Sequence, residues 1–139
     1  MISYLIDTSA AARLLLNASV RKAWHEPVTA GVVAICDAVE LELLFTARSL
    51  ADRLRKKEVL GELFGWVVTP EDVWARAHRL QQALTENGLH RSAGVADLVI
   101  ATTAAANDLT VLHYDRDFEP VAGVTGRPAQ WISAPGSIS

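Results

Sequence analysis

The segment Ile2-Ser3-Tyr4-Leu5-Ile6-Asp7-Thr8-Ser9 decides how this chain is expected to fold. Its apolar residues 2–6 predict a short buried strand, and Asp-Thr-Ser predicts a polar turn in which Thr8 or Ser9 caps a helix over residues 10–16. Similar apolar segments predict further strands at residues 32–35, 66–68, 110–113 and 130–132.

Helical segments alternate with these strands. The sequence predicts helices at residues 20–25, 37–48, 49–63, 70–86 and 95–107. Thr69-Pro70 is a typical helix start, and Asn87-Gly88 is a typical helix end. Short strands that alternate with helices indicate an α/β protein with a parallel sheet of four or five strands, covered on both faces. We expect one domain over residues 1–133 and a flexible tail over residues 134–139.

Composition limits the class of protein. The 139 residues suffice for one domain with a core, and the content of 50% apolar and 21% charged residues is that of a globular protein. No apolar run approaches the roughly 20 residues of a membrane span, and the N-terminus does not read as a signal, so we expect a cytoplasmic protein. The single cysteine, Cys36, is expected to be a small buried residue.

The net charge of −3 argues against a protein that coats nucleic acid passively, but not against a nuclease. Ten of the 13 basic residues are arginines, which favours planar recognition of phosphate or carboxylate groups.

Four acidic residues stand in apolar surroundings, where a carboxylate is costly unless it is paired, protonated or bound to a metal. Asp7 and Asp115 follow apolar strands, whereas Glu42 and Asp97 lie near the starts of apolar helical segments. In a parallel sheet, the carboxyl ends of the strands and the starts of the following helices meet at one edge. The four acids are therefore expected to converge there.

Carboxylates that converge in this way predict a site for Mg²⁺ or Mn²⁺, which prefer oxygen ligands. Two such cations about 3.5–4 Å apart can clamp a phosphodiester and generate a hydroxide. The histidines offer no competing metal site because none forms an i, i+4 pair or has a cysteine partner, and we interpret them as surface or core residues. They are His25, His78, His90 and His113.

Each acid also has a purely structural interpretation. Asp7 can cap the following helix, and Asp97 can be a first-turn acid favoured by the helix dipole. Glu42 can be a solvated helix residue, although Glu40 is expected to be the more exposed of the two. Asp115 can belong to a turn. All four interpretations together would require acids to gather at one edge by chance.

Four segments resemble the motif blocks of PIN-domain ribonucleases, at residues 4–10, 42–48, 94–101 and 113–118. In order, spacing and chain length they are most similar to the VapC toxins of bacterial toxin–antitoxin pairs, over about residues 2–132. The resemblance implies a three-layer α/β/α fold and a magnesium- or manganese-dependent endoribonuclease. It also implies a homodimer that a VapB-like antitoxin neutralises.

The resemblance assigns roles to individual acids. It implies that Asp7 and Asp97 are metal ligands and that Glu42 is a ligand or a base that orients water. Asp115 matches the fourth acid of the family, and Asp117 is expected to share its role as a metal ligand. The implied reaction is attack by water on an RNA phosphate, which leaves a 5′-phosphate and a 3′-hydroxyl.

Residues around the acids are expected to support the site or bind RNA. Ser9 matches a small hydroxyl residue that supports the acids in the family. Four arginines near the motifs are candidates for gripping phosphates, with salt-bridged or solvated surface residues as the alternative: Arg13, Arg48, Arg91 and Arg116. Apolar residues in segments 14–16 and 50–63 are candidates for a dimer interface or an antitoxin groove, with core packing as the alternative.

Other functions remain open at this level. A receiver-like phospho-acceptor module needs a lysine after a late strand, and the lysines stand elsewhere, at Lys22, Lys56 and Lys57. A PIN-like binding scaffold would not need intact acids. The carboxylates alone leave open a metal-dependent phosphatase or a DNA nuclease, and only the family resemblance favours RNA.

Overall fold

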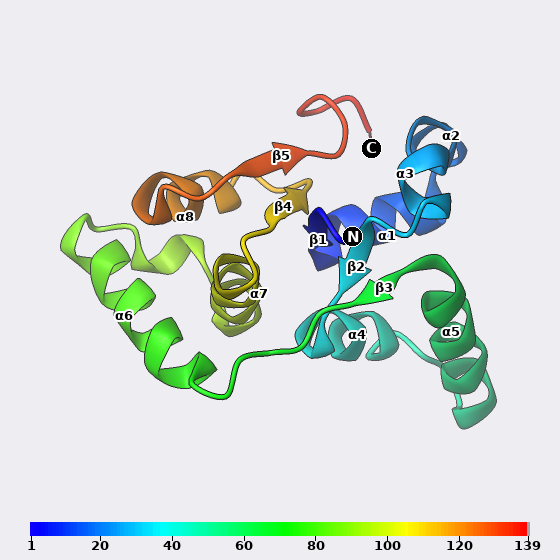
Figure 1. Ribbon diagram of the computed structural model, residues 1–139, viewed down its shortest axis with the longest axis horizontal. Helices are drawn as coiled ribbons and strands as arrows, with labels where there is room; N and C mark the ends of the chain where they lie inside the picture. The colour runs from blue at the N-terminus through cyan, green and yellow to red at the C-terminus, as the bar shows by residue number, and fades with distance from the viewer. Residues whose placement is uncertain (139) are drawn as a thin grey trace.

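A computed structural model describes residues 1–138 and gives one parallel sheet over that range (Figure 1). The strand order across the sheet is β3-β2-β1-β4-β5. The expected α/β fold is confirmed, and of the four or five strands expected, five form. The strands are β1 (Tyr4–Ile6), β2 (Val33–Ile35), β3 (Gly65–Trp66), β4 (Thr110–His113) and β5 (Ala129–Trp131).

The central strand β1 lies where the strand order reverses. The chain builds outward from β1 to β2 and β3, and then returns to add β4 on the other side of β1. Leu5 pairs with Ala34 of β2 and with Val111 of β4. Leu5 and Ile6 are fully buried, as expected for a strand covered on both faces. A reversal of this kind opens a crevice at the carboxyl ends of the two central strands.

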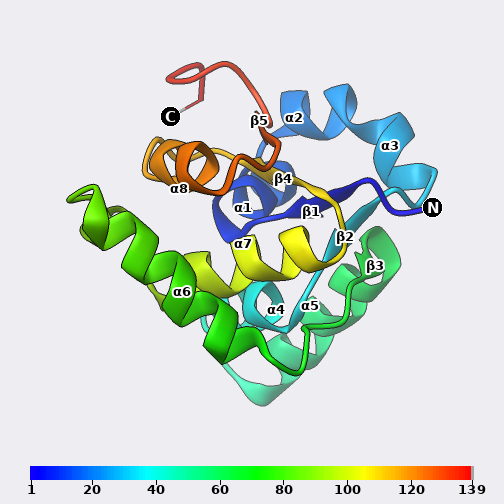
Figure 2. The same ribbon diagram turned by 60° about the vertical axis from the view of Figure 1, so that its left-hand side comes forward.

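Helices fill the connections between the strands. Helix α7, from the connection between β3 and β4, packs against β1 and β4, and helix α4, from the connection between β2 and β3, contacts both α1 and α7. Figure 2 places α7 and α1 on different sides of β1. The helices are α1 (Thr8–Leu16), α2 (Ala18–Ala23), α3 (His25–Thr29), α4 (Asp37–Leu44), α5 (Leu50–Leu63), α6 (Val73–Glu86), α7 (Val95–Ala106) and α8 (Phe118–Thr125).

Three predicted helix starts were wrong. The helix expected over residues 20–25 begins at Ala18 as α2 and is followed by a separate helix, α3. Asp7 caps α1 through its side chain, which leaves Thr8 and Ser9 inside the first turn. Helix α6 begins at Val73 and not at Pro70, since the Val73 amide donates to the Pro70 carbonyl in a separate turn that precedes the helix.

Two further differences concern segments around the site. Helix α4 ends at Leu44, before the expected residue 48, and Ser49 caps α5 as a separate helix. Helix α8 was not expected. It begins at Phe118, directly after Asp117, and ends at Gly126, whose positive φ of 66° suits glycine.

The core lies on both faces of the sheet. Helix α7 is buried from Leu98 to Ala104, and its small residues allow close packing. The indole N–H of Trp24 donates a hydrogen bond to the Ile132 carbonyl at 2.8 Å, which links Trp24 to the C-terminal part of the chain. Cys36 is fully buried, as expected, and burial raises the pKa of its thiol.

The C-terminal residues 134–138 fold back onto the domain. The Tyr114 hydroxyl accepts a hydrogen bond from the Ile138 amide at 2.8 Å and donates to the Ile138 carbonyl at 3.2 Å. Ser139, which belongs to the expected flexible tail, lies outside the described residues. Within residues 1–138, none of the helices has the length and apolar character that a membrane crossing would require.

Candidate active site

The acids predicted from sequence gather at the carboxyl ends of β1 and β4. Asp7 directly follows β1, and its amide donates to the Leu112 carbonyl of β4 at 2.9 Å. One residue after β4, the Tyr114 amide donates to the Ser9 hydroxyl at 2.9 Å. These two bonds tie the first turn of α1 to the exit of β4, so that the loops carrying Asp7 and Asp115 lie side by side.

Asp7 is the most buried of the acids, with an exposed fraction of 3%. Its Oδ1 accepts from the Ser9 hydroxyl at 2.7 Å and from the Ala10 amide at 2.9 Å. Its Oδ2 accepts no hydrogen bond from residues 1–138. Burial raises the pKa of Asp7 to about 6, against the lowering effect of the two hydrogen bonds, and the negative charges of Asp97 and Asp115 add to the rise.

Asp97 reaches the same region from the first turn of α7. Its Oδ2 accepts from the Gly94 amide at 3.1 Å, which is the helix-start interaction expected of a first-turn acid. Burial raises the pKa of Asp97, the Gly94 bond lowers it, and the nearby charges of Asp115, Glu42 and Asp117 raise it. The five acids therefore share one electrostatic environment.

Glu42 projects from α4 on the open side of the site. The Thr8 hydroxyl donates to its Oε1, which links the first turn of α1 to α4. Glu42 is exposed, whereas Glu40 is half-buried and forms an ion pair with Lys57 at 3.4 Å. The expectation that Glu40 is the more exposed of the two was therefore wrong, because Lys57 covers it.

Asp115 and Asp117 lie in the exposed loop between β4 and α8. The Asp117 amide donates to Asp115 Oδ1 at 2.9 Å, which is the turn interaction considered for Asp115. The Asp115 amide donates to Nδ1 of His113 at 3.3 Å. Burial lowers the pKa of His113, which favours the neutral ring whose Nδ1 can accept this bond.

The donor set fits a hard cation such as Mg²⁺. In each of three aspartates, one carboxylate oxygen accepts a hydrogen bond and the other accepts none from residues 1–138, namely in Asp7, Asp97 and Asp115. Within the same range, no three His, Cys, Asp or Glu side chains stand close enough together to hold a metal ion.

The predicted arginines differ in their surroundings. Arg13 is half-buried, with its guanidinium carbon 5.2 Å from the centre of the Tyr114 ring and its Nη1 3.5 Å from the Ser9 carbonyl. It packs against the same two loops as the acids. The other three are exposed, and their side chains form no hydrogen bond or ion pair within residues 1–138: Arg48, Arg91 and Arg116.

Two residues near the acids were not predicted as part of the site. Thr8 was considered only as a helix cap, yet it contacts Glu42. His113 was interpreted as a surface or core residue and is buried in the core, and in addition its ring accepts a hydrogen bond from the Asp115 amide. The signal in the sequence was the position of His113 in a buried strand, two residues before an acid.

The sequence of motifs and the fold agree with a known family. The family model for the PIN domain matches residues 4–124. The chain belongs to the PIN domain family. Two curated relatives of this PIN domain come from Mycobacterium tuberculosis. Ribonuclease VapC21 is 40% identical and covers 96% of each chain, and Ribonuclease VapC18 is 37% identical over 97% of this PIN domain chain and 98% of its own. The resemblance to VapC ribonucleases is confirmed.

Solved structures share the fold of this PIN domain. A chain of DNA-bound VapBC from Salmonella typhimurium superimposes with a TM-score of 0.76, 16% identity and coverage of 96% and 100%. A chain of VapBC-1 from nontypeable Haemophilus influenzae gives a TM-score of 0.73, 20% identity and coverage of 95% and 98%. The expected three-layer PIN fold is therefore confirmed.

Proposed function

We propose that this PIN domain protein is the toxin of a toxin–antitoxin pair and cleaves RNA in the cytoplasm as a magnesium- or manganese-dependent endoribonuclease. The observation that carries the proposal is the electrostatic coupling of acids from four separate segments at the switch point of the sheet. Coupled carboxylates that raise one another's pKa are costly to the fold and favour a cation between them. The family membership supports RNA as the substrate.

The acids have separate roles in this proposal. Asp7, Asp97 and Asp115 would hold the cation, since each has one carboxylate oxygen without a hydrogen-bond partner within residues 1–138. Ser9 and the Ala10 amide keep Asp7 in place. The cation, when bound, activates water and offsets the negative charge that develops on the phosphate.

Other side chains of the protein accept the proton of the attacking water and bind the RNA substrate. Glu42, fixed at Oε1 by Thr8, accepts the proton of the attacking water at its other oxygen. Asp117 orients Asp115 through its amide. Phosphates on either side of the cut bind to arginines at the rim of the site, namely Arg13, Arg48, Arg91 and Arg116. The bond from phosphorus to the 3′ oxygen breaks, and that oxygen takes up a proton from solvent, so the products carry a 5′-phosphate and a 3′-hydroxyl.

Cleavage of total RNA tests the proposal. We expect the purified protein to cut RNA at a few discrete positions with Mg²⁺ and to stop when a chelator is added. Asp97→Asn is expected to abolish these cuts because it removes a charge that holds the cation. The measurement is sequencing of the cleaved ends, together with their sensitivity to a 5′-phosphate-dependent exonuclease.

Asp108→Asn is the matched control. Asp108 is an exposed aspartate that pairs with Arg127 at 2.7 Å, at the end of the sheet opposite the acids. The same substitution there should leave cleavage unchanged. Cuts that persist in Asp97→Asn or survive the chelator, or products with a cyclic phosphate, would contradict the proposed reaction.

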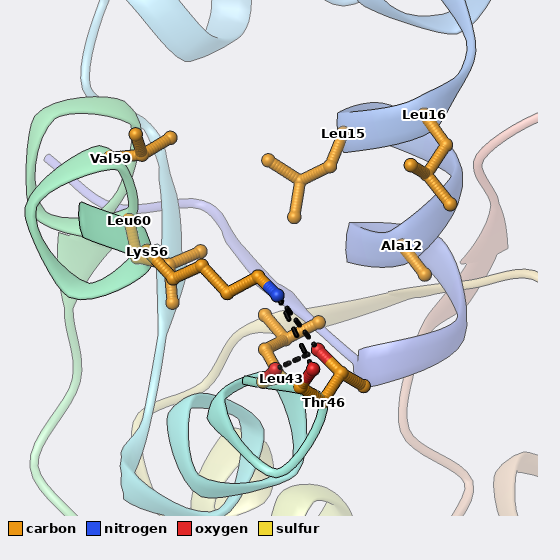
Figure 3. Close-up of a pocket in the computed structure, with 8 residues that line it drawn as sticks. All are labelled: Ala12, Leu15, Leu16, Leu43, Thr46, Lys56, Val59 and Leu60. Carbon is orange, nitrogen blue, oxygen red and sulfur yellow. Dashed lines mark hydrogen bonds between the residues drawn. The ribbon is translucent and has the colours of Figure 1, made fainter. Parts of the chain in front are cut away.

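The antitoxin has a candidate groove close to the acids. Helices α1, α4 and α5 enclose an apolar cavity of about 330 Å³. Figure 3 shows Leu15 of α1 pointing towards α5, with Leu43 of α4 and Thr46, just after α4, at the base, and Lys56 reaching across to Thr46. The exposed apolar residues expected in segments 14–16 and 50–63 thus include Leu16 and Val59 on this groove. An amphipathic helix of an antitoxin fits such a surface.

We expect Val59→Asp to weaken binding of the cognate antitoxin at least tenfold, since it places an unpaired charge in an apolar contact (roughly the loss of one hot-spot residue). The measurement is a titration of the purified antitoxin by calorimetry. Val68→Asp is the matched control, because Val68 is equally apolar, 71% exposed and outside the groove. Equal affinity of the two variants would place the antitoxin elsewhere.

A second apolar face is available for the homodimer. Trp74 of α6 is 59% exposed and Val95 at the start of α7 is 66% exposed, and both line one shallow depression. Large apolar side chains in such a patch favour burial against another surface. We propose that two copies of the chain meet here, which leaves the groove of α1, α4 and α5 free for the antitoxin.

A further inference from the structure

A four-residue loop carries two of the acids. Residues 114–117 connect β4 to α8, and Asp115 and Asp117 are both exposed in it. A short exposed loop does not by itself fix the direction of a carboxylate. The anchors of this loop therefore decide where Asp115 lies.

Both ends of the loop are anchored at His113. At the start of the loop, the Asp115 amide donates to His113 Nδ1 at 3.3 Å. At the end of the loop, the Phe118 ring stacks on the His113 ring at 5.2 Å with an angle of 28° between the planes. One side chain thus holds the backbone at the acid and the first residue of the following helix.

The His113 ring is itself immobilised. It is 2% exposed, and Trp131 of β5 lies at 4.9 Å between ring centres. The His113 carbonyl accepts from the Ile132 amide at 2.8 Å, which fixes the backbone of the last residue in β4. The Nδ1 acceptor therefore has a defined position relative to the sheet.

We propose that His113 is a positioning residue that places Asp115 for cation binding through its Nδ1 acceptor. Aromatic packing alone would be served by a phenylalanine, which lacks this acceptor. Without the acceptor, the partly buried Asp115 amide loses its partner and turns towards water, and the carboxylate moves with it. Residues that orient metal ligands through hydrogen bonds act in this way.

This inference rests on the proposed function, and three substitutions separate the acceptor from packing. His113→Leu and His113→Asn have similar size, but only asparagine keeps an acceptor where Nδ1 stands. His113→Phe keeps the stacking on Phe118 and Trp131 and removes the acceptor. Melting temperature and circular dichroism check that each variant is folded.

The experiment measures Mn²⁺ binding by calorimetry, hydrogen exchange of the Asp115 amide by NMR, and cleavage kinetics. We expect the dissociation constant for Mn²⁺ to rise about tenfold in His113→Leu and His113→Phe. His113→Asn should restore it to within about threefold of the original protein, with slow exchange of the Asp115 amide. The kcat at fixed Mg²⁺ should fall in parallel, while the KM for RNA stays unchanged.

The outcomes distinguish a failure of the positioning role of His113 from a failure of the proposed nuclease function. Folded His113→Leu that binds Mn²⁺ as tightly as His113→Asn would overturn the positioning role and leave the nuclease in place. A change in KM alone would also overturn it. If the unmodified protein binds no Mn²⁺ and cuts no RNA, then the proposed function fails and the inference fails with it.

Discussion

Asp7→Asn is expected to lower RNA cleavage by about a thousandfold or more and, at the same time, to stabilise the metal-free protein. The loss of activity follows from the loss of a buried charge at the proposed cation site. The gain in stability follows because asparagine keeps an Oδ1 acceptor for Ser9 and the Ala10 amide without a buried charge. Function and stability are thus opposed at this residue.

The sign of the stability effect depends on pH. The pKa of Asp7 is about 6 in the folded protein and 3.8 in the unfolded chain, so the folded state binds the proton more tightly. Stability is then highest below pH 4 as far as this group is concerned, and it falls as the pH rises towards 6. At pH 7 the ionised carboxylate costs about 2–3 kcal/mol, so Asp7→Asn should raise the melting temperature by about 7–10 °C.

Thermal unfolding in the presence of a chelator measures this effect. At pH 4 the two melting temperatures should lie much closer together, because Asp7 is protonated in the folded protein and only partly ionised in the unfolded chain. Asp108→Asn serves again as a surface control. A lower melting temperature of Asp7→Asn at pH 7 would show that the carboxylate stabilises the fold, in conflict with its raised pKa.

The second large effect is expected in the pH dependence of cleavage. At subsaturating Mg²⁺, the rate should fall about tenfold per pH unit below pH 6, because protonated Asp7 is a poor ligand. The raised pKa of Asp97 makes the fall steeper. At saturating Mg²⁺ the midpoint should move to lower pH, since the cation competes with the proton for the same carboxylates.

Single-turnover rates from pH 5 to pH 8 at two Mg²⁺ concentrations test this prediction. Circular dichroism at each pH establishes that the protein stays folded. A profile with the same midpoint at both Mg²⁺ concentrations would contradict competition between proton and cation. The effect would then belong to a group outside the cation site.

The sequence predicted the parts of the fold that depend on local chemistry. Apolar runs that end in polar turns predicted the strands, and the rule that parallel strands meet at one edge brought Asp7 and Asp115 together. Helix starts were harder to predict, because several adjacent residues can each serve as the N-cap of the same helix. Thr69-Pro70 has a strong helix-start composition, yet the turn closed by Val73 and Pro70 delays α6.

The candidate site shows why an alternative interpretation need not exclude a function. Asp7 does cap a helix, and Asp115 does form a turn, as their local sequences allow. Each uses one carboxylate oxygen for this purpose and keeps the other available. Contacts between distant segments, such as Thr8 with Glu42, depend on how α1 and α4 pack and have no signature in either segment.

The pairing of β1 with β4 has a consequence for how the protein is made. Tyr4 lies opposite Thr110, so the central strand receives one of its two neighbours only after more than a hundred further residues have been added. During synthesis on the ribosome, Asp7 emerges early and Asp115 late. A nascent chain that ends before β4 lacks the second wall of the crevice. A chain that stops before β4 therefore lacks Asp115 and Asp117 and cannot assemble the acids of the proposed site.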